Sequence, residues 1–199
     1  MKSTGKLHNL NAWERKAASA TSLVVPAGVD GLDELLPCGG WPKSGLVEII
    51  VPGDDVDFMS LLMPALARFS RQGRWIAMVA PPCQARARLF TDTGVDPVKV
   101  LQVNPHPGRS ALWTAESMLQ SGNCSVVLAW PNCNTELMDK RLQNAAASGK
   151  ALAILVRYEG LSMQPSAVDV RLKLETCADG SAVYLVDSQG EILSGMALP

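Results

Sequence analysis

The chain has 199 residues, of which 47% are hydrophobic and 19% charged, and its formal net charge at pH 7 is -1. This composition predicts a folded protein, and the near-neutral charge excludes a globally basic surface for nucleic acid. The opening residues lack the apolar core of a signal peptide, and no apolar run reaches the roughly 18 residues of a membrane span. We therefore expect a cytoplasmic protein without membrane contact.

Cysteine and histidine are too few and too scattered to indicate a metal centre. The five cysteines are odd in number and form no C-x-x-C pair, so neither a disulfide framework nor a zinc site is indicated. The two histidines, His8 and His106, offer little for a catalytic triad. We expect no metal, no cofactor and no catalytic residue.

Residues 1–22 are polar and predict a flexible basic arm ahead of a single domain over 23–199. Leu10 and Trp13 could anchor this arm on a partner, and a frayed terminus is the alternative. The following stretch "GVDGLDELLPCGGWPKSG" predicts a short helix that a Gly-Gly-Trp-Pro turn ends, because paired glycines permit positive φ and proline stops a helix.

From Leu46 onward, short apolar runs alternate with amphipathic ones. We predict strands over 46–51, 75–80, 99–103, 124–130 and 151–157, and helices over 57–72, 84–93, 111–121 and 134–147. This alternation predicts an α/β fold with a mostly parallel sheet and helices on both faces.

The last part of the sequence has a two-residue period. "AVDVRLKLE" predicts a half-buried strand with charged Asp169, Arg171, Lys173 and Glu175 toward solvent, and "AVYLVD" predicts its antiparallel partner. We expect this hairpin at the edge of the sheet.

The first strand-to-helix turn stands where α/β proteins usually hold a phosphate. Its residues are Val51, Gly53, Asp54, Asp55, Val56, Asp57 and Phe58. On the G-x-x-x-x-G-K-[S/T] frame of a P-loop, Val51 and Val56 replace the glycines, Asp57 the lysine and Phe58 the hydroxyl. Carboxylates here repel a polyphosphate, so we expect a degenerate loop without nucleotide. The same carboxylates suit a helix cap, which we favour, or a divalent cation site.

Two further positions lack the residues of an ATPase. Pro81 and Pro82 follow the second strand, where a catalytic carboxylate would polarise water. Trp130 and Asn132 stand at the end of the fourth strand, where an acidic residue would hold the metal. We therefore expect a protein that is not an enzyme.

Several stretches resemble known families. "GVDGLDELLPCGGWPKSGLVEI" and "AVDVRLKLETCADGSAVYLVDSQGEI" resemble RecA recombinases, which implies a RecA-like core. "LLMPALARFSRQGRWIAMVAPP", "TGVDPVKVLQVNP" and "ALWTAESMLQSGNCSVVLAWP" are similar to two bacterial DNA-damage-response families, ImuA and SulA. The long lead and the final hairpin favour ImuA over SulA.

The ImuA resemblance implies a non-catalytic accessory protein of the SOS response that supports mutagenic translesion DNA synthesis. Its implied partners are an ImuB-like polymerase adaptor, an error-prone DNA polymerase and RecA. The SulA resemblance implies the alternative, a cell-division inhibitor that sequesters FtsZ. Either resemblance is compatible with a homodimer.

Basic side chains near the second predicted strand are candidates for binding an acidic partner or DNA phosphates, with ordinary surface charge as the alternative. They are Arg68, Arg71, Arg74, Arg86 and Arg88. The SulA resemblance places Arg74 and Lys99 on basic positions used for FtsZ, but it places Leu89 where that family has tryptophan. Trp13, Trp41 and Trp113 are either interface anchors or core residues, and the sequence does not decide between these roles.

Overall fold

The structure is a computed structural model, and it describes residues 23–53, 57–82, 90, 92–105, 110–131, 136–161, 166–177 and 180–198. The arm predicted over 1–22 lies outside the described residues, as does most of the helix predicted over 84–93. No helix in these ranges is long and apolar enough to cross a membrane.

A single eight-stranded sheet forms the centre of the fold, in the order β10-β9-β8-β3-β7-β6-β4-β5. Its strands are β3 (Gly45–Val51), β4 (Trp75–Val79), β5 (Val100–Val103), β6 (Cys124–Ala129), β7 (Leu152–Tyr158), β8 (Val170–Cys177), β9 (Gly180–Val186) and β10 (Ile192–Ala197). The strands from β8 to β5 in this order are parallel, and β9 and β10 are antiparallel to their neighbours. The predicted α/β fold with a mostly parallel sheet is confirmed.

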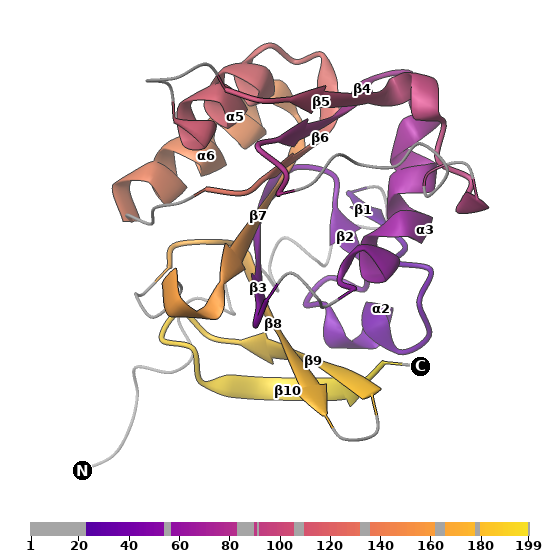
Figure 1. The fold of residues 1–199 in the computed structure, drawn as a ribbon, viewed down its shortest axis with the longest axis vertical. Helices are drawn as coiled ribbons and strands as arrows, with labels where there is room; N and C mark the ends of the chain where they lie inside the picture. Colours follow the sequence, from indigo (N-terminus) through magenta and orange to yellow (C-terminus); the bar gives the residue numbers. More distant parts are fainter. Residues whose placement is uncertain are drawn as a thin grey trace.

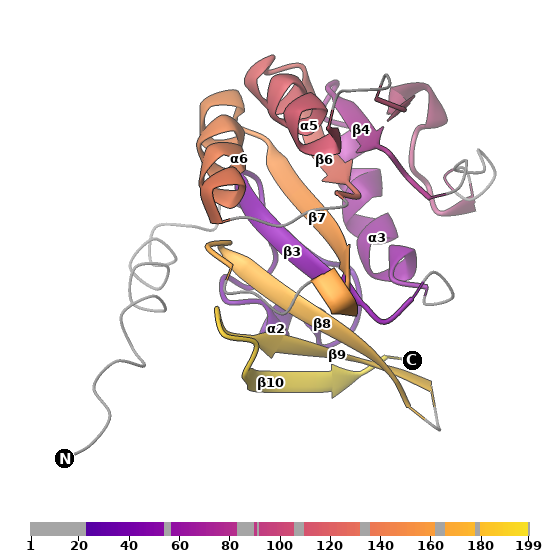
Figure 2. The ribbon, with the colours of Figure 1, turned by 60° about the vertical axis from the view of Figure 1, so that its left-hand side comes forward.

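Helices cover both faces of the parallel part of the sheet (Figure 1). Helices α2 (Leu32–Leu35) and α3 (Met59–Ser70) lie on one face, and α5 (Ala111–Gln120) and α6 (Glu136–Gly149) lie on the other, as Figure 2 also shows. Within β6, Val126 packs into the core on the α3 side while its neighbour Val127 packs into the core under α5 and α6. Burial on both faces explains why these strands read as continuous apolar runs.

The α2 region contains a small ladder that the sequence did not predict. Strand β1 (Val24–Val25) pairs antiparallel with β2 (Trp41–Pro42), so the expected turn is itself a strand. Gly40 has a φ of 156°, and a Cβ there would lie 2.7 Å from the carbonyl oxygen of Val25, so only glycine permits this approach. The side chain of Trp41 is fully buried, which assigns it to the core.

Two short 3-10 helices, η1 (Pro97–Lys99) and η2 (Glu159–Leu161), complete the described elements. Apart from the helix predicted over 84–93, which lies mostly outside the described residues, the predicted element boundaries agree with the structure to within a few residues, but β10 was not predicted. A turn explains its presence: the Asp187 carboxylate accepts hydrogen bonds from the amides of Gln189 and Glu191 at 2.9 and 2.8 Å and turns the chain back along β9.

The prediction that β8 presents its charged side chains to solvent was wrong for Arg171. This side chain is only 4% exposed. Asp169 is also half-buried, and its carboxylate accepts hydrogen bonds from the Leu46 amide at 2.8 Å and from Gln143 at 2.7 Å. The two-residue alternation of β8 was predicted correctly. The face that carries the charged side chains, however, is partly covered by contacts with β3 and α6 rather than open to water.

Candidate partner-binding surface

Apolar side chains are exposed where β4 and β5 begin, at one edge of the sheet. Trp75 is 40% exposed, Val98 72% and Leu101 41%. We call these three residues, together with Lys99, the edge surface. Strand β5 is the last strand on this side of the sheet, and tryptophan at such a position offers a large apolar area with a polar end.

The strand register brings these residues together. Leu101 pairs with Ala77, so Trp75, two residues before Ala77 on the same strand, lies on the same face as Leu101. The Lys99 ammonium lies 5.5 Å from the centroid of the Trp75 ring and donates a hydrogen bond to the carbonyl of Gly73 at 3.1 Å. Lysine and tryptophan therefore form a cation–π pair at the surface.

The loop that carries Val98 and Lys99 is fixed by local hydrogen bonds. The Asp96 carboxylate accepts a hydrogen bond from the Val98 amide at 3.0 Å and caps η1, and Pro97 provides the first helical residue. The Asp96 amide donates to the Ser70 hydroxyl at 3.3 Å, which ties this loop to the end of α3. The edge surface is thus held in place by the fold.

Arg74, next to Trp75, binds the ends of two helices. Its guanidinium donates to the carbonyls of Gly122 at 3.4 Å, Gly149 at 3.0 Å and Lys150 at 2.6 Å. These carbonyls lie in or just after the last turns of α5 and α6, where unpaired acceptors and the negative ends of the helix dipoles favour a cation. Arg74 therefore positions α5 and α6 beneath the edge surface.

The other predicted basic residues are only partly described. Arg68 lies in the last turn of α3 and Arg71 directly after it, and both are exposed. Arg86, Arg88 and Leu89 lie outside the described residues. Of the predicted basic residues that the structure describes, Lys99 and Arg74 lie at the start of β4 and β5.

The turn between β3 and α3 is described on both sides of a gap that contains Asp54, Asp55 and Val56. Before the gap, Val51 is buried at the end of β3 and Gly53 is half-buried. After it, the Asp57 carboxylate accepts a hydrogen bond from the Ser60 amide at 3.3 Å, as expected of a carboxylate at a helix start.

Phe58, at the position of the P-loop hydroxyl, belongs to the packing of the fold. Its ring lies 6.3 Å from that of Trp130, centroid to centroid, and the two rings are tilted by 59°. Trp130 itself is buried and directly follows β6. The two rings therefore pack against each other beyond the ends of β3 and β6. In the described part of the chain, no group of three histidine, cysteine or acidic side chains could hold a metal ion.

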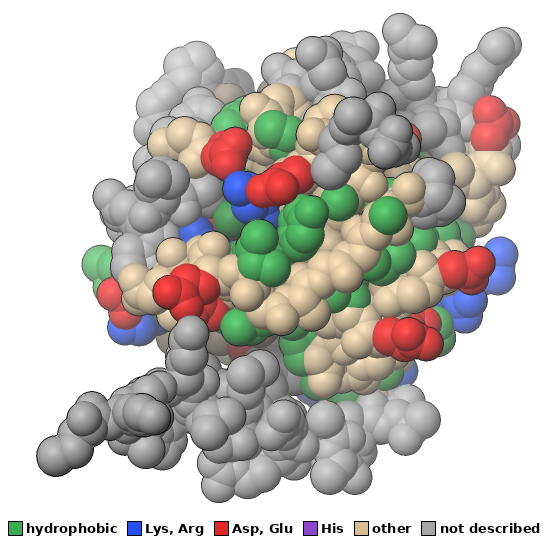
Figure 3. All heavy atoms as spheres, turned by 90° about the horizontal axis from the view of Figure 1, so that it is seen from below, with side chains coloured by type: hydrophobic (Ala, Val, Ile, Leu, Met, Phe, Trp, Pro, Cys, Tyr) green, Lys and Arg blue, Asp and Glu red, His purple; other side chains and the backbone are tan. Residues whose placement is uncertain are grey.

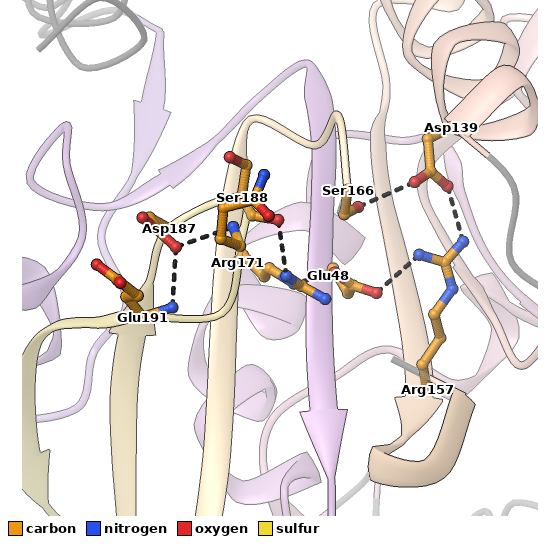
Figure 4. A network of polar contacts seen from close by, with 9 residues as sticks. Glu48, Asp139, Arg157, Ser166, Arg171, Asp187, Ser188 and Glu191 are labelled. Carbon is orange, nitrogen blue, oxygen red and sulfur yellow. Dashed lines mark hydrogen bonds and ion pairs between the residues drawn. The ribbon is translucent and has the colours of Figure 1, made fainter. Parts of the chain in front are cut away.

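A buried network of charges joins β3, β7, β8 and α6 (Figure 4). Arg157 donates to Glu48 and to Asp139, each at 2.7 Å, and all three side chains are fully buried. The second carboxylate oxygen of Glu48 accepts from Arg171 at 2.6 Å. The second oxygen of Asp139 accepts from the Ser166 hydroxyl at 2.9 Å. Two cations thus neutralise two carboxylates inside the protein.

The network extends to the turn between β9 and β10. Arg171 donates to the carbonyl of Ser188 at 3.1 Å, and the Ser166 amide donates to the same carbonyl at 3.2 Å. Burial alone lowers the pKa of Arg157 and is the largest single effect, but hydrogen bonds and attraction from Asp139 and Glu48 outweigh it and raise the pKa. Arg157 therefore stays charged, and its Nε is a buried donor that has no hydrogen-bond partner among the described residues.

Sequence reasoning missed both the exposed Trp75 and this network. A signal for the network was present, because Glu48 interrupts the apolar run "LVEIIV" and Arg157 the run "ILVR". Charged residues inside buried strands must be paired, so the two interruptions could have been matched. For Trp75 the sequence gives no comparable signal, since its exposure depends on which elements pack around the start of β4.

Comparison with known proteins gives consistent matches. The family described as "Cell division inhibitor SulA" matches residues 45–153. Proteins named cell division inhibitor SulA from Edwardsiella piscicida and Erwinia pyrifoliae are 32% and 36% identical, over 58% and 62% of this chain and 70% and 74% of those proteins. A protein of the same name from Yersinia pseudotuberculosis is 31% identical over 76% of this chain and 86% of its own length.

A solved structure, the crystal structure of SulA from Pseudomonas aeruginosa, aligns with a TM-score of 0.49 and 23% identity, over 57% of this chain and 97% of that chain. The preference for ImuA, and with it the role in translesion synthesis, was wrong, because the family match and the curated relatives described above carry the SulA name. The final hairpin and most of the long lead that suggested ImuA lie outside the matched residues 45–153.

Proposed function

The chain belongs to the SulA family of cell division inhibitors, and from this premise we propose that it arrests division in the SOS response by binding FtsZ. Binding withholds FtsZ subunits from assembly, so no covalent chemistry is needed. The proposal requires a surface with an apolar anchor and a complementary charge, as protein interfaces generally have.

The edge surface is the contact region that we propose. The observation that carries this assignment is the exposed indole of Trp75, with Lys99 beside its ring and with Val98 and Leu101 exposed next to it. Tryptophan is among the residues that dominate interface energies, and a lysine beside it favours an acidic partner. The pair supplies an aromatic anchor that Leu89, at the family's tryptophan position, cannot supply.

Titration calorimetry of FtsZ with this protein, together with light scattering of FtsZ assembly, tests the proposal. We expect the wild type to bind FtsZ and suppress assembly, and Trp75→Ala to weaken binding by at least about tenfold, as for an interface hot spot. Trp113→Ala is the matched control, because Trp113 is 44% exposed in the first turn of α5, at the opposite end of that helix from the Gly122 carbonyl that Arg74 binds. Equal losses in the two variants, or no binding by the wild type, contradict the proposal.

We also propose that the sheet is a RecA-like core that no longer binds nucleotide. The order of β3, turn and α3 supports this origin, and Phe58 packing against Trp130 in place of a metal-binding hydroxyl supports the loss. Calorimetric titration with ATP and Mg²⁺ is expected to show no binding, and ATP hydrolysis is expected to be absent. Micromolar ATP affinity would overturn the proposal.

A further inference from the structure

Exposed apolar side chains occur at both ends of the sheet, but they are supported differently. At one end, Ile192 and Leu193 belong to strand β10, and hydrophobic side chains gather in the middle of the described surface seen from there (Figure 3). At the other end, Val98 of the edge surface belongs to η1, a 3-10 helix of three residues. Such a helix has poor hydrogen-bond geometry, so its conformation depends on contacts with its surroundings.

Asp96 provides two of the hydrogen-bond acceptors that shape η1. Its carboxylate accepts from the Val98 amide at 3.0 Å, and its carbonyl accepts from the Lys99 amide at 3.0 Å. The orientation of Asp96 therefore sets the positions of both residues that η1 contributes to the edge surface.

Ser70, the last residue of α3, holds the backbone of Asp96. The Ser70 hydroxyl donates to the Ala67 carbonyl at 2.8 Å and accepts from the Asp96 amide at 3.3 Å. A hydroxyl can do both at once, because it has one donor and two acceptor lone pairs. An alanine at this position would leave the Asp96 amide without this acceptor.

The helix that carries Ser70 is firmly packed. Leu66 and Phe69, one turn or less before Ser70, are each 1% exposed and belong to the core. Ser70 itself is 3% exposed, so a docked protein does not reach its side chain. An effect of the Ser70 hydroxyl on a partner is therefore indirect, and its contact with Asp96 links it to the edge surface.

We propose that Ser70 is a positioning residue for the binding of FtsZ, an inference that rests on the proposed function of the edge surface. Through Asp96, Ser70 holds η1 in the conformation in which Val98 and Lys99 are presented to the partner. A surface that is ordered before binding loses less conformational entropy when the partner docks. Loss of the Ser70 hydroxyl therefore weakens binding although the partner does not touch it.

Titration calorimetry with FtsZ tests this role. We expect Ser70→Ala to weaken binding by about threefold to tenfold, the range of a single hydrogen bond and less than the loss expected from Trp75→Ala. Ser117→Ala is the matched control, because the Ser117 hydroxyl also donates to a carbonyl of its own helix, at 3.0 Å in α5. We expect no change in this control, and equal losses in the two variants would overturn the proposal.

A second set of variants separates positioning from a general loss of folded protein. Val98→Ala combined with Lys99→Ala removes the side chains that η1 presents. In that background, Ser70→Ala is expected to cause no further loss of binding, because there is nothing left for it to position. The same loss in both backgrounds would overturn the proposal.

Amide hydrogen exchange shows whether η1 itself responds, with or without FtsZ. The Val98 and Lys99 amides are expected to exchange faster in Ser70→Ala than in the wild type. The Trp113 amide, which donates to the Ser110 hydroxyl at 3.1 Å at the start of α5, is the internal control and keeps its rate. Unchanged exchange in η1 overturns the proposal. Absence of FtsZ binding by the wild type instead contradicts the proposed function, and the exchange rates then still decide whether Ser70 holds η1.

Discussion

Two regions of the sheet are stabilised by different forces: apolar packing under α5 and α6, and the charge network between β7, β3 and β8. Strand β7 contributes a residue to each region, two positions apart. Leu155 lies in the apolar core under α5 and α6, whereas Arg157, on the same face of the same strand, lies in the charge network with Glu48 and Asp139. Apolar packing is non-directional and tolerates change of shape, but buried charges are stable only when every partner is present. We therefore expect the region of the charge network to tolerate substitution less well than the apolar region.

The largest effect is expected from Arg157→Met, which leaves the carboxylates of Glu48 and Asp139 without their shared cation. We expect a loss of about 3 to 5 kcal/mol in the free energy of unfolding, because an uncompensated charge stays buried. Urea denaturation followed by circular dichroism measures this loss. Arg157→Met combined with Asp139→Asn is expected to recover part of it, and simple addition of the two losses would show that the network is not cooperative.

Leu155→Ala tests the apolar side of the comparison on the same strand. We expect a loss of about 2 to 5 kcal/mol, the usual cost of a cavity in a well-packed core. The same urea experiment measures it. If Leu155→Ala costs clearly more than Arg157→Met, the contrast between the two regions is reversed.

Asp169 lies where the two regions meet, since it links the start of β8 to β3 and to α6. Asp169→Ala leaves the Leu46 amide without this acceptor, and we expect a loss of about 1 to 3 kcal/mol. Asp169→Asn keeps an acceptor oxygen and is expected to lose less. Thermal unfolding of the two variants separates hydrogen bonding from charge, and equal losses would assign the effect to charge.

The smallest effect is expected at Lys173, which contacts Glu175 at 2.7 Å and Glu159 at 2.9 Å at the outer end of β8. Hydrogen bonds to Glu175 and then Glu159 raise the pKa of Lys173 above its ordinary value of 10.5. A raised pKa stabilises the fold below that ordinary value, and this contribution is lost as the pH rises through the folded-state pKa.

Because these side chains are partly in water, the contribution is at most about 1 kcal/mol and weakens with salt. Urea denaturation of the wild type and Lys173→Met from pH 7 to strongly alkaline pH measures it. The two proteins are expected to differ at neutral pH and to converge in strong alkali. A difference that persists there would assign the effect to packing of the lysine stem.

The alternation of strands and helices in the sequence was sufficient to predict the parallel sheet, because burial on both faces leaves a local apolar pattern. The sequence also predicted the hairpin of β8 and β9 and an acidic helix start at Asp57. The comparisons, and not the pattern, separated SulA from ImuA, since the two resemblances share the same stretches of this chain.

What only the tertiary structure decided concerns pairs of residues distant in the sequence. Arg171 reads as a solvent-facing residue of an alternating strand, but Glu48, 123 residues away, holds it inside. Trp75 is exposed at the first position of β4, and Trp41 is buried because β2, the strand that carries it, pairs with β1 and packs on the core. Local periodicity is fixed by neighbouring residues, whereas the burial of a charge or an indole depends on which strand lies beside it.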